Sequence, residues 1–232
     1  MTHGSTARHE VLSVVFRVSP PAPDVPAELC VLLWQRALAP DLGAWALPGG
    51  TLGDDENLPD SARRQLAEKV DVREVRHLEQ LSVFAEPGRV PGLRTIASTF
   101  LGLVPLVADP VLPVDTRWHP VSDLPRTAFD HGTMVGHART RLAAKLSYTN
   151  IAFALAPDEF TLSTLRDIYC AALGHQVDTT NLQRVLTRRG VIASTGRTAP
   201  PGPAGGRPAT LYRFADARLR VTDEFAALKP PG

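Results

Sequence analysis

The chain has 232 residues, of which 44% are hydrophobic, and it carries 25 Lys and Arg against 24 Asp and Glu. This hydrophobic fraction is sufficient for a packed core, which excludes a mostly disordered chain. No apolar run approaches the roughly 20 residues that a membrane-spanning helix needs, and the N-terminal residues carry no signal-peptide pattern. A net charge of +1 would argue against a nucleic-acid-binding protein, but this average hides an uneven distribution.

The two cysteines, Cys30 and Cys170, are far apart in the sequence and lie in apolar surroundings. Their spacing does not suit a metal site, so we expect two buried free thiols, as in a reducing compartment. The length allows one large domain or two modest ones. We therefore expect a cytoplasmic protein that has no membrane partner.

In the first 149 residues, short β-rich runs surround two helical patterns. The first two runs read as neighbouring strands joined by the proline-rich loop 19–26, and a glycine turn follows the strand-like run that begins at Trp45. Apolar residues that recur every four positions mark the helices. We predict strands at 11–17, 29–36, 79–85, 95–105 and 116–121, and helices at 58–70 and 130–146.

The pattern changes around Asn150, after which two short helices are followed by two short strands. Thr161 is a hydroxyl N-cap candidate and Gly174 a stop for the first helix. Helix, turn, helix and a hairpin with a basic loop is the order of a winged helix-turn-helix. The second helix is predicted from Asp178 or Thr179 to Gly190, and the strands at 191–195 and 209–214, around a loop rich in Gly, Pro and Arg.

The charge differs between these two parts of the chain. Residues 150–232 hold ten Lys and Arg against seven Asp and Glu, whereas residues 1–149 hold fifteen against seventeen. Between Arg184 and Arg220 there are eight arginines and one acid, Asp216. A run of charge usually marks a solvated face, but this run is all arginine and falls on the elements that a winged helix presents to DNA. We predict that this part of the chain binds DNA.

One motif in the first part is long enough to indicate a family. Gly50 is followed after five residues by Glu56, and after seven more by Arg64-Gln-Leu-Ala-Glu-Lys-Val-Asp-Val72. This stretch resembles the Nudix box, which reads Gly, five residues, Glu, seven residues, Arg-Glu-apolar-any-Glu-Glu, any, Gly, apolar. The preceding Trp45-Ala-Leu-Pro-Gly-Gly is also typical of Nudix proteins. The resemblance implies a Nudix fold, a mixed sheet flanked by helices.

The departures from the box concern its metal ligands. The family has carboxylates at the positions that are here Gln65, Glu68 and Lys69, which share one helix face and would converge on divalent cations. Mg²⁺ prefers anionic oxygen ligands, whereas an amide binds it poorly and an ammonium repels it. We therefore expect Mg²⁺-dependent hydrolysis of ADP-ribose or similar nucleotides to be absent or vestigial, with no catalytic residue, metal or cofactor. Ordinary Mg²⁺-dependent turnover abolished by Glu68→Gln would contradict this.

The two outer charged residues of the box, Glu56 and Arg64, are retained. The resemblance implies that they form an ion pair that braces the loop against the helix. Asp71 stands where the family has Gly, and Asp also tolerates unusual backbone angles. Retention of the bracing pair without the metal ligands suggests a fold kept for binding.

Taken together, the two parts resemble the Nudix-related transcriptional regulators, the NrtR family, which are repressors of NAD-biosynthesis genes. The resemblance implies an α+β protein with a Nudix-like effector-sensing domain at 8–149 and a C-terminal winged helix-turn-helix DNA-binding domain at 150–232. It further implies a homodimer that binds palindromic operator DNA and senses a NAD-derived metabolite such as ADP-ribose. The similar segments include 116–125, 128–132, 160–165 and 206–214, with Asn181.

The candidate effector site is expected at the Gly49-Gly50 turn, which Arg36 faces from the end of a predicted strand. A guanidinium suits phosphate recognition, and glycines let a ligand approach the backbone. Trp45 could stack on an adenine or belong to the core, Arg36 could equally be a surface residue, and His119 and His131 are expected to be structural. The effector-binding candidates are Arg36, Trp45, Gly49, Gly50, Glu56 and Glu68.

For DNA, the second helix of the C-terminal domain is the expected reading helix. Its first turn would lie near the phosphates, and Arg or Gln on later turns would reach base edges in the major groove. We predict that Arg184→Ala and Arg207→Ala each weaken operator binding without unfolding the protein. The DNA-binding candidates are Thr179, Thr180, Asn181, Gln183, Arg184, Thr187, Arg188, Arg197 and Arg207, the last two in the wing.

Two other interpretations remain open at this point. The protein could be an active Nudix hydrolase with an accessory winged domain, and its metal ligands would then include Glu86, Asp54 or Asp55. Alternatively, the winged domain could serve protein contacts, with the Nudix part as a scaffold. Salt-dependent, sequence-selective DNA binding would separate the regulator from both.

Overall fold

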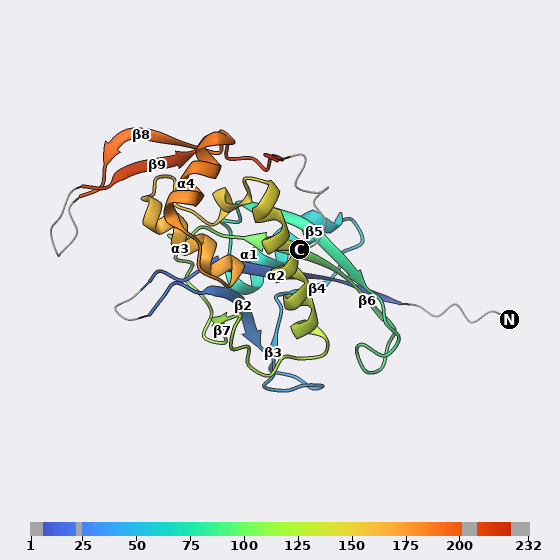
Figure 1. Ribbon diagram of the computed structural model, residues 1–232. Helices are drawn as coiled ribbons and strands as arrows, with labels where there is room; N and C mark the ends of the chain where they lie inside the picture. The colour runs from blue at the N-terminus through green and yellow to red at the C-terminus, as the bar shows by residue number, and fades with distance from the viewer. Residues whose placement is uncertain (1–6, 22–24, 201–207, 224–232) are drawn as a thin grey trace. The chain divides into compact units, whose positions relative to one another are not determined.

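The computed structural model describes residues 7–21, 25–200 and 208–223. The chain packs as two units. Figure 1 shows its helices and strands, coloured from blue at the N-terminus to red at the C-terminus. The first unit runs to Arg17 and includes Leu29–Val104 and Ala108–Arg139, and the second includes Val18–Glu28, Pro105–Val107 and the chain from Thr140 onward. Because the change of unit falls inside one helix, the domain border at residue 149 stays a prediction.

The first unit is built on one mixed sheet. Its central strands lie in the order β3-β2-β1-β6-β5, with β4 antiparallel to β1 and β7 antiparallel to β2. Strands β1 and β6 are parallel, so the sheet mixes both directions, which confirms the expected architecture. The strands are β1 Arg8–Val18, β2 Leu29–Gln35, β3 Trp45–Ala46, β4 Gly49–Thr51, β5 His77–Phe84, β6 Thr95–Leu103 and β7 Thr116–Pro120.

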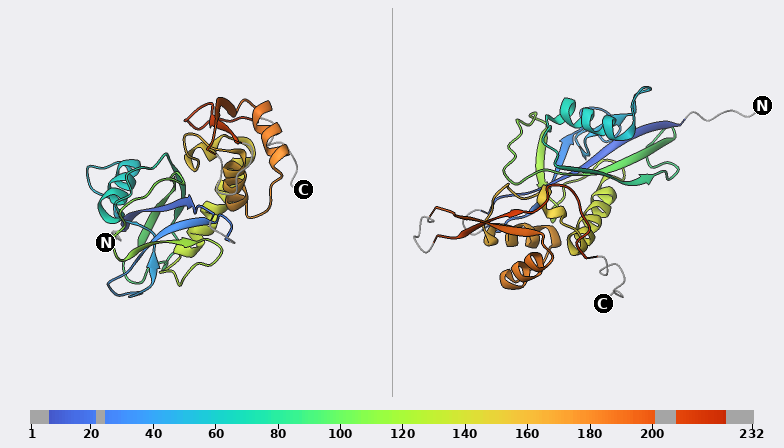
Figure 2. Two further views of the ribbon diagram at one scale, coloured as in Figure 1. Left: turned by 90° about the vertical axis from the view of Figure 1, so that its left-hand side faces the viewer. Right: turned by 90° about the horizontal axis from the view of Figure 1, so that it is seen from above.

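Helix α1, Leu58–Val70, has the bounds that its apolar periodicity predicts, and it lies along the sheet (Figure 2). Asn57 caps it, because its side chain accepts the backbone N–H of Asp60. Leu66 and Val70 are buried among residues of β1 and β2. Asp71 ends the helix at φ 51°, the left-handed conformation for which the Nudix box has Gly.

Helix α2, His131–Tyr148, is followed by the 3₁₀ turn η1, Ile151–Ala154. The helix begins one residue later and ends two residues later than the sequence pattern indicates. Residues 131–139 belong to the first unit and residues 140–148 to the second. All four residues of η1 are buried.

The second unit has the order of a winged helix-turn-helix: α3 Leu162–Leu173, α4 Thr179–Arg188, β8 Ile192–Thr198 and β9 Thr210–Phe214. Thr161 and Asp178 accept backbone N–H groups at the starts of the two helices, and Gly174 ends α3 at φ 77°. The views in Figure 2 show α3 and α4 beside the β8–β9 hairpin. Residues 162–214 therefore have the predicted element order.

One boundary in this hairpin differs from the prediction. Strand β8 continues to Thr198 instead of ending at residue 195, and its pairing with β9 shifts register between Ser194 and Thr198. Gly196, at φ 74°, lies within this irregularity. A bulge lets a strand continue past a residue that breaks the regular pairing, so the glycine did not mark the strand end.

Neither cysteine is in a disulfide bond, but only Cys30 is buried, and Cys170 is half-buried. The Cys170 sulfur accepts the backbone N–H of Val177 at 3.2 Å. Within the described ranges, no helix combines the length and the apolar character needed to cross a membrane.

Candidate functional site

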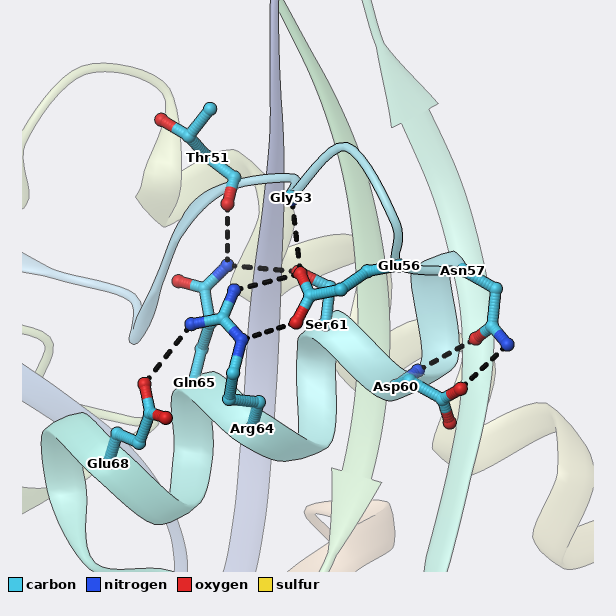
Figure 3. A network of polar contacts seen from close by, with 9 residues as sticks. All are labelled: Thr51, Gly53, Glu56, Asn57, Asp60, Ser61, Arg64, Gln65 and Glu68. Carbon is cyan, nitrogen blue, oxygen red and sulfur yellow. Dashed lines mark hydrogen bonds and ion pairs between the residues drawn. The ribbon is translucent and has the colours of Figure 1, made fainter.

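The loop before α1 is tied to the helix by the expected ion pair, which the structure confirms (Figure 3). Arg64 donates through Nε to one Glu56 oxygen and through Nη2 to the other at 2.8 Å. Glu56 also accepts the backbone N–H of Gly53 at 3.0 Å. The bond from Arg64 is the main reason that the pKa of Glu56 falls to about 2. The ion pair therefore braces the loop against the helix.

Glu68 belongs to the same hydrogen-bond network as Glu56 and Arg64. Its carboxylate accepts Nη1 of Arg64 at 3.1 Å, and its side chain is 61% exposed. Of the three box positions that carry carboxylates in Nudix hydrolases, Glu68 alone is acidic here, and it is engaged with a cation. The pairing reduces the negative charge that Glu68 could offer to a metal ion.

Gly49 and Gly50 are the first two residues of β4, where the backbone passes very close to its neighbours. A Cβ at Gly49 would lie 2.2 Å from the carbonyl oxygen of Val11 in β1, so only glycine fits there. A Cβ at Gly50 would lie 2.5 Å from Oε1 of Gln65 and 2.6 Å from Nζ of Lys69. The two helix residues that depart from the Nudix box thus converge on the glycine turn.

The side chains of Gln65 and Lys69 do not fit a divalent cation. The amide of Gln65 is buried and donates to the carbonyl of Thr51 at 3.4 Å and to Ser61 at 3.3 Å. The Lys69 ammonium donates to the backbone carbonyl of Gly49. Burial lowers the pKa of Lys69, and the nearby Arg64 lowers it further. A positive group thus occupies the position where a metal site needs a negative ligand.

A buried arginine that the sequence analysis missed lies in the loop between β5 and β6. The Arg89 side chain is 2% exposed and bonds to both oxygens of Asp130, at 2.9 and 2.7 Å, and to Glu10 at 2.6 Å. The partners are 41 and 79 residues away in sequence, so no local pattern indicates the pairing. This cluster joins the β5–β6 loop to β1 and to the start of α2.

The effector candidates Arg36 and Trp45 lie where β2 and β3 are paired, since Gln35 pairs with Trp45. Nε of Arg36 donates to the carbonyl of Pro40 at 3.1 Å, and its guanidinium lies 4.8 Å from the ring centre of Phe129. Trp45 is half-buried, with its ring centre 4.2 Å from that of His119. The structure thus gives both residues intramolecular partners and leaves their effector role a prediction.

His131 has the structural surroundings expected of it, whereas the buried Nε2 of His119 has no hydrogen-bond partner among the described residues. His131 is 3% exposed, and its Nδ1 accepts the backbone N–H of Leu47 at 3.0 Å. Burial lowers the pKa of His131 to about 4 and also lowers that of His119. Within the described residues, no three His, Cys, Asp or Glu side chains gather closely enough to hold a metal ion. Asp54, Asp55 and Glu86 are exposed on loops.

In the second unit, α4 buries one face and exposes the other. Leu182 and Leu186 are buried against the unit's core. The exposed residues recur at the spacing of one helix face, and Arg184 donates to the side chain of Asn181 at 2.7 Å. We call this the α4 face: it consists of Thr180, Asn181, Arg184, Thr187 and Arg188.

Other DNA-binding candidates are placed differently. Thr179 is half-buried, and so is Gln183, whose side chain donates to the hydroxyl of Tyr212 in β9 at 3.0 Å. Arg197 is exposed on β8 and forms an ion pair with Glu159. Arg207 lies outside the described residues.

Two polar residues of the second unit also escaped the sequence analysis. Arg189, one residue beyond α4, donates to the carbonyl of Ser147 at 2.8 Å and pairs with Asp223. Asn150 is 2% exposed, donates to the carbonyls of Asp216 and Arg218, and accepts the backbone N–H of Arg220. Both hold the C-terminal segment in place, a role that only the tertiary structure reveals.

Known proteins resemble this chain in both units. Residues 15–136 match the family model of the NUDIX domain, and residues 152–214 match that of the NrtR DNA-binding winged helix domain. The ADPR responsive transcriptional repressor NtrR of Acinetobacter baylyi is 33% identical over 195 residues, which span 81% of this chain and 76% of that protein.

Solved structures agree with these matches. The crystal structure of Shewanella oneidensis NrtR complexed with a 27mer DNA has a TM-score of 0.72 at 28% identity, covering 88% of this chain and 92% of that chain. A MutT/nudix family protein from Enterococcus faecalis shares the fold, with a TM-score of 0.72 at 22% identity over 92% of this chain and 90% of that one. The chain therefore belongs to the NrtR family, in which a Nudix domain is joined to a DNA-binding winged helix domain.

Proposed function

We propose that the protein is a transcriptional repressor that binds operator DNA through its second unit and responds to ADP-ribose or a related NAD-derived metabolite through its Nudix domain. The observation that carries the proposal is the α4 face, which presents two arginines on an otherwise polar, exposed helix surface. The names of the Acinetobacter and Shewanella relatives, an ADPR responsive repressor and an NrtR complexed with DNA, support it.

Recognition of DNA follows from the geometry of a helix in the major groove. The exposed hydroxyl of Thr180 in the first turn suits a phosphate oxygen, and such a contact positions the helix without reading sequence. Arg184 and Arg188 lie one turn apart and can each donate two hydrogen bonds to a guanine edge. Arg197 would contact the backbone beside the groove only by exchanging its ion pair with Glu159 for a phosphate oxygen. Two copies of the chain would read the two halves of a palindrome.

The Nudix domain is proposed to bind its nucleotide without hydrolysing it. Hydrolysis of a phosphoanhydride bond needs a cation that neutralises charge and prepares a water molecule. Gln65 and the Lys69 ammonium are unsuitable ligands for that cation, and Glu68 is bound to Arg64. The domain is then a sensor, and NAD-biosynthesis genes are the proposed targets.

A mobility-shift assay on DNA from the gene's own promoter region, with and without ADP-ribose, tests this function. We expect a sequence-selective shift that weakens as salt rises, because each phosphate contact releases counterions. ADP-ribose should change the midpoint of the titration, whereas ribose 5-phosphate, which lacks the adenosine and the second phosphate, is the matched control. Equal affinity for a scrambled DNA of the same composition would contradict the proposal.

Hydrolysis is tested separately by incubating the full chain with ADP-ribose and Mg²⁺ and following AMP release. We expect no turnover above that of the Glu68→Gln variant. Turnover that depends on Mg²⁺ and is lost in Glu68→Gln would favour the hydrolase interpretation instead.

A further inference from the structure

We propose that the Lys69 ammonium binds the diphosphate of the effector in place of a divalent cation, so that effector binding in this protein is independent of metal. The inference rests on the proposed sensing function and concerns the same site. It begins from the misfit already described: two of the three box positions carry an amide and an ammonium. Position 69 therefore carries a positive charge where the Nudix box has a negative carboxylate.

The position of Lys69 supports such a role. Its Nζ bonds to the carbonyl of Gly49, twenty residues earlier in the chain, and lies 2.6 Å from where a Cβ on Gly50 would be. The side chain thus crosses from α1 to the glycine turn. Nζ of Lys69 and Oε1 of Gln65 fill the space that a side chain at position 50 would need, so glycine there lets the ammonium lie against the backbone.

The neighbouring cations are engaged in a different way. Arg64 is bonded to Glu56 and Glu68, and Arg89 to Glu10 and Asp130. Among the described residues, Lys69 forms a hydrogen bond to a neutral carbonyl and no ion pair with a carboxylate. Its charge is consequently not neutralised by a direct partner, whereas those of the two arginines are.

The chemistry of an ammonium suits a phosphate oxygen. Lys has three N–H donors, and the bond to Gly49 uses one of them, which leaves two for a ligand. Lys69 is exposed as a residue, while the bond from its ammonium to Gly49 is partly buried. A bond between a charged donor and a charged acceptor is about twice as strong as a neutral one, so its loss should weaken binding by about 10-fold to 100-fold.

Calorimetric titration of the full chain tests the proposal, first with ADP-ribose in EDTA and then with Mg²⁺. We expect the same Kd in both, and we expect Lys69→Met to weaken binding about 10-fold to 100-fold in both. Arg63→Met removes a positive charge from an exposed position of the same helix and should leave the Kd unchanged. Circular dichroism and the mobility shift without effector verify that each variant is folded.

A second variant converts the site. Gln65→Glu with Lys69→Glu places the family's carboxylates on α1, and its ADP-ribose binding should be lost in EDTA and recovered with Mg²⁺. The inference is overturned if the unmodified chain binds ADP-ribose only with Mg²⁺, or if Lys69→Met binds as tightly as the unmodified chain. Either result leaves the sensing function intact.

Titration with inorganic pyrophosphate tests the role of Lys69 separately from the proposal that ADP-ribose is the effector. If pyrophosphate binds in EDTA and Lys69→Met abolishes that binding while ADP-ribose does not bind, then the proposed effector is wrong and the role of Lys69 stands. If neither compound binds the unmodified chain in EDTA, the role of Lys69 is overturned.

Discussion

Two pairs of arginines, one pair in each unit, are used differently. In the Nudix unit, Arg64 and Arg89 are bonded to two carboxylates each. In the winged-helix unit, Arg184 and Arg188 lie on the exposed face of α4 and have no carboxylate partner among the described residues. An arginine whose charge is already matched holds the fold together, whereas one without a carboxylate remains available to an external anion such as phosphate.

Arg189 shows that the location of an arginine, rather than its residue type, decides whether it holds the fold together or stays available to an external anion. It directly follows Arg188, yet it bonds to Ser147 and Asp223. It therefore belongs with the structural arginines although it lies in the most basic stretch of the sequence. Four sets of variants test the contrast between the units, from the largest expected effect to the smallest.

Replacement of Arg89 by Met should destabilise the Nudix unit by about 3 kcal/mol, because Glu10 and Asp130 would then face each other without the buried cation between them. Urea unfolding at neutral pH measures this, with exposed Arg63→Met as the control that should change stability by no more than about 0.5 kcal/mol. Operator binding by the folded Arg89→Met variant should be unchanged. A loss below about 1 kcal/mol would mean that the cluster is not structural.

The buried His131 should make stability depend on pH. Its pKa is about 4 in the folded chain and 6.5 when unfolded, so only the unfolded chain takes up the proton between these values. The free energy of unfolding should therefore be highest above pH 6.5 and fall by about 3 kcal/mol as the pH is lowered to 4. His131→Asn keeps an acceptor for the Leu47 N–H but cannot titrate. If this variant shows the same decline between pH 6.5 and 4, His131 is not its cause.

In the winged-helix unit, Arg184→Ala with Arg188→Ala should weaken operator binding about 100-fold or more, since each lost base or phosphate contact contributes about 1–3 kcal/mol. The melting temperature should not change, because neither residue has a carboxylate partner among the described residues. Arg63→Ala with Arg73→Ala removes the same net charge from the Nudix unit and should leave DNA binding nearly unchanged. Equal effects of the two pairs would show that total charge, not the α4 face, determines affinity.

The smallest effect is expected at Gln183, whose side chain already donates to Tyr212. Gln183→Ala should weaken operator binding by less than about fivefold, which is below the change expected for a lost base contact. Tyr212→Phe removes the same hydrogen bond from the other side and should have a similar effect. A tenfold loss in Gln183→Ala alone would place this residue on the DNA.

Much of the local structure was determined by short-range patterns. The bounds of α1 follow from Asn57, Pro59 and the apolar repeat, and those of α3 from Thr161 and Gly174. Caps and glycine stops act within a few residues, so a single sequence contains them. The bulge at Gly196 in β8 was missed, because whether a glycine ends a strand or only disturbs it depends on the partner strand.

The spacing from Gly50 to Val72 also determined the family, the pair of Glu56 and Arg64 and the missing carboxylates. Only the tertiary structure decided where the remaining charges go. Arg89 bonds to Glu10 and Asp130, which are 79 and 41 residues away in the sequence. Lys69 on α1 donates a hydrogen bond to the carbonyl of Gly49 in β4. Charge and residue type can be read along the chain, but whether a charge is neutralised depends on which distant groups the fold brings within a few ångströms of it.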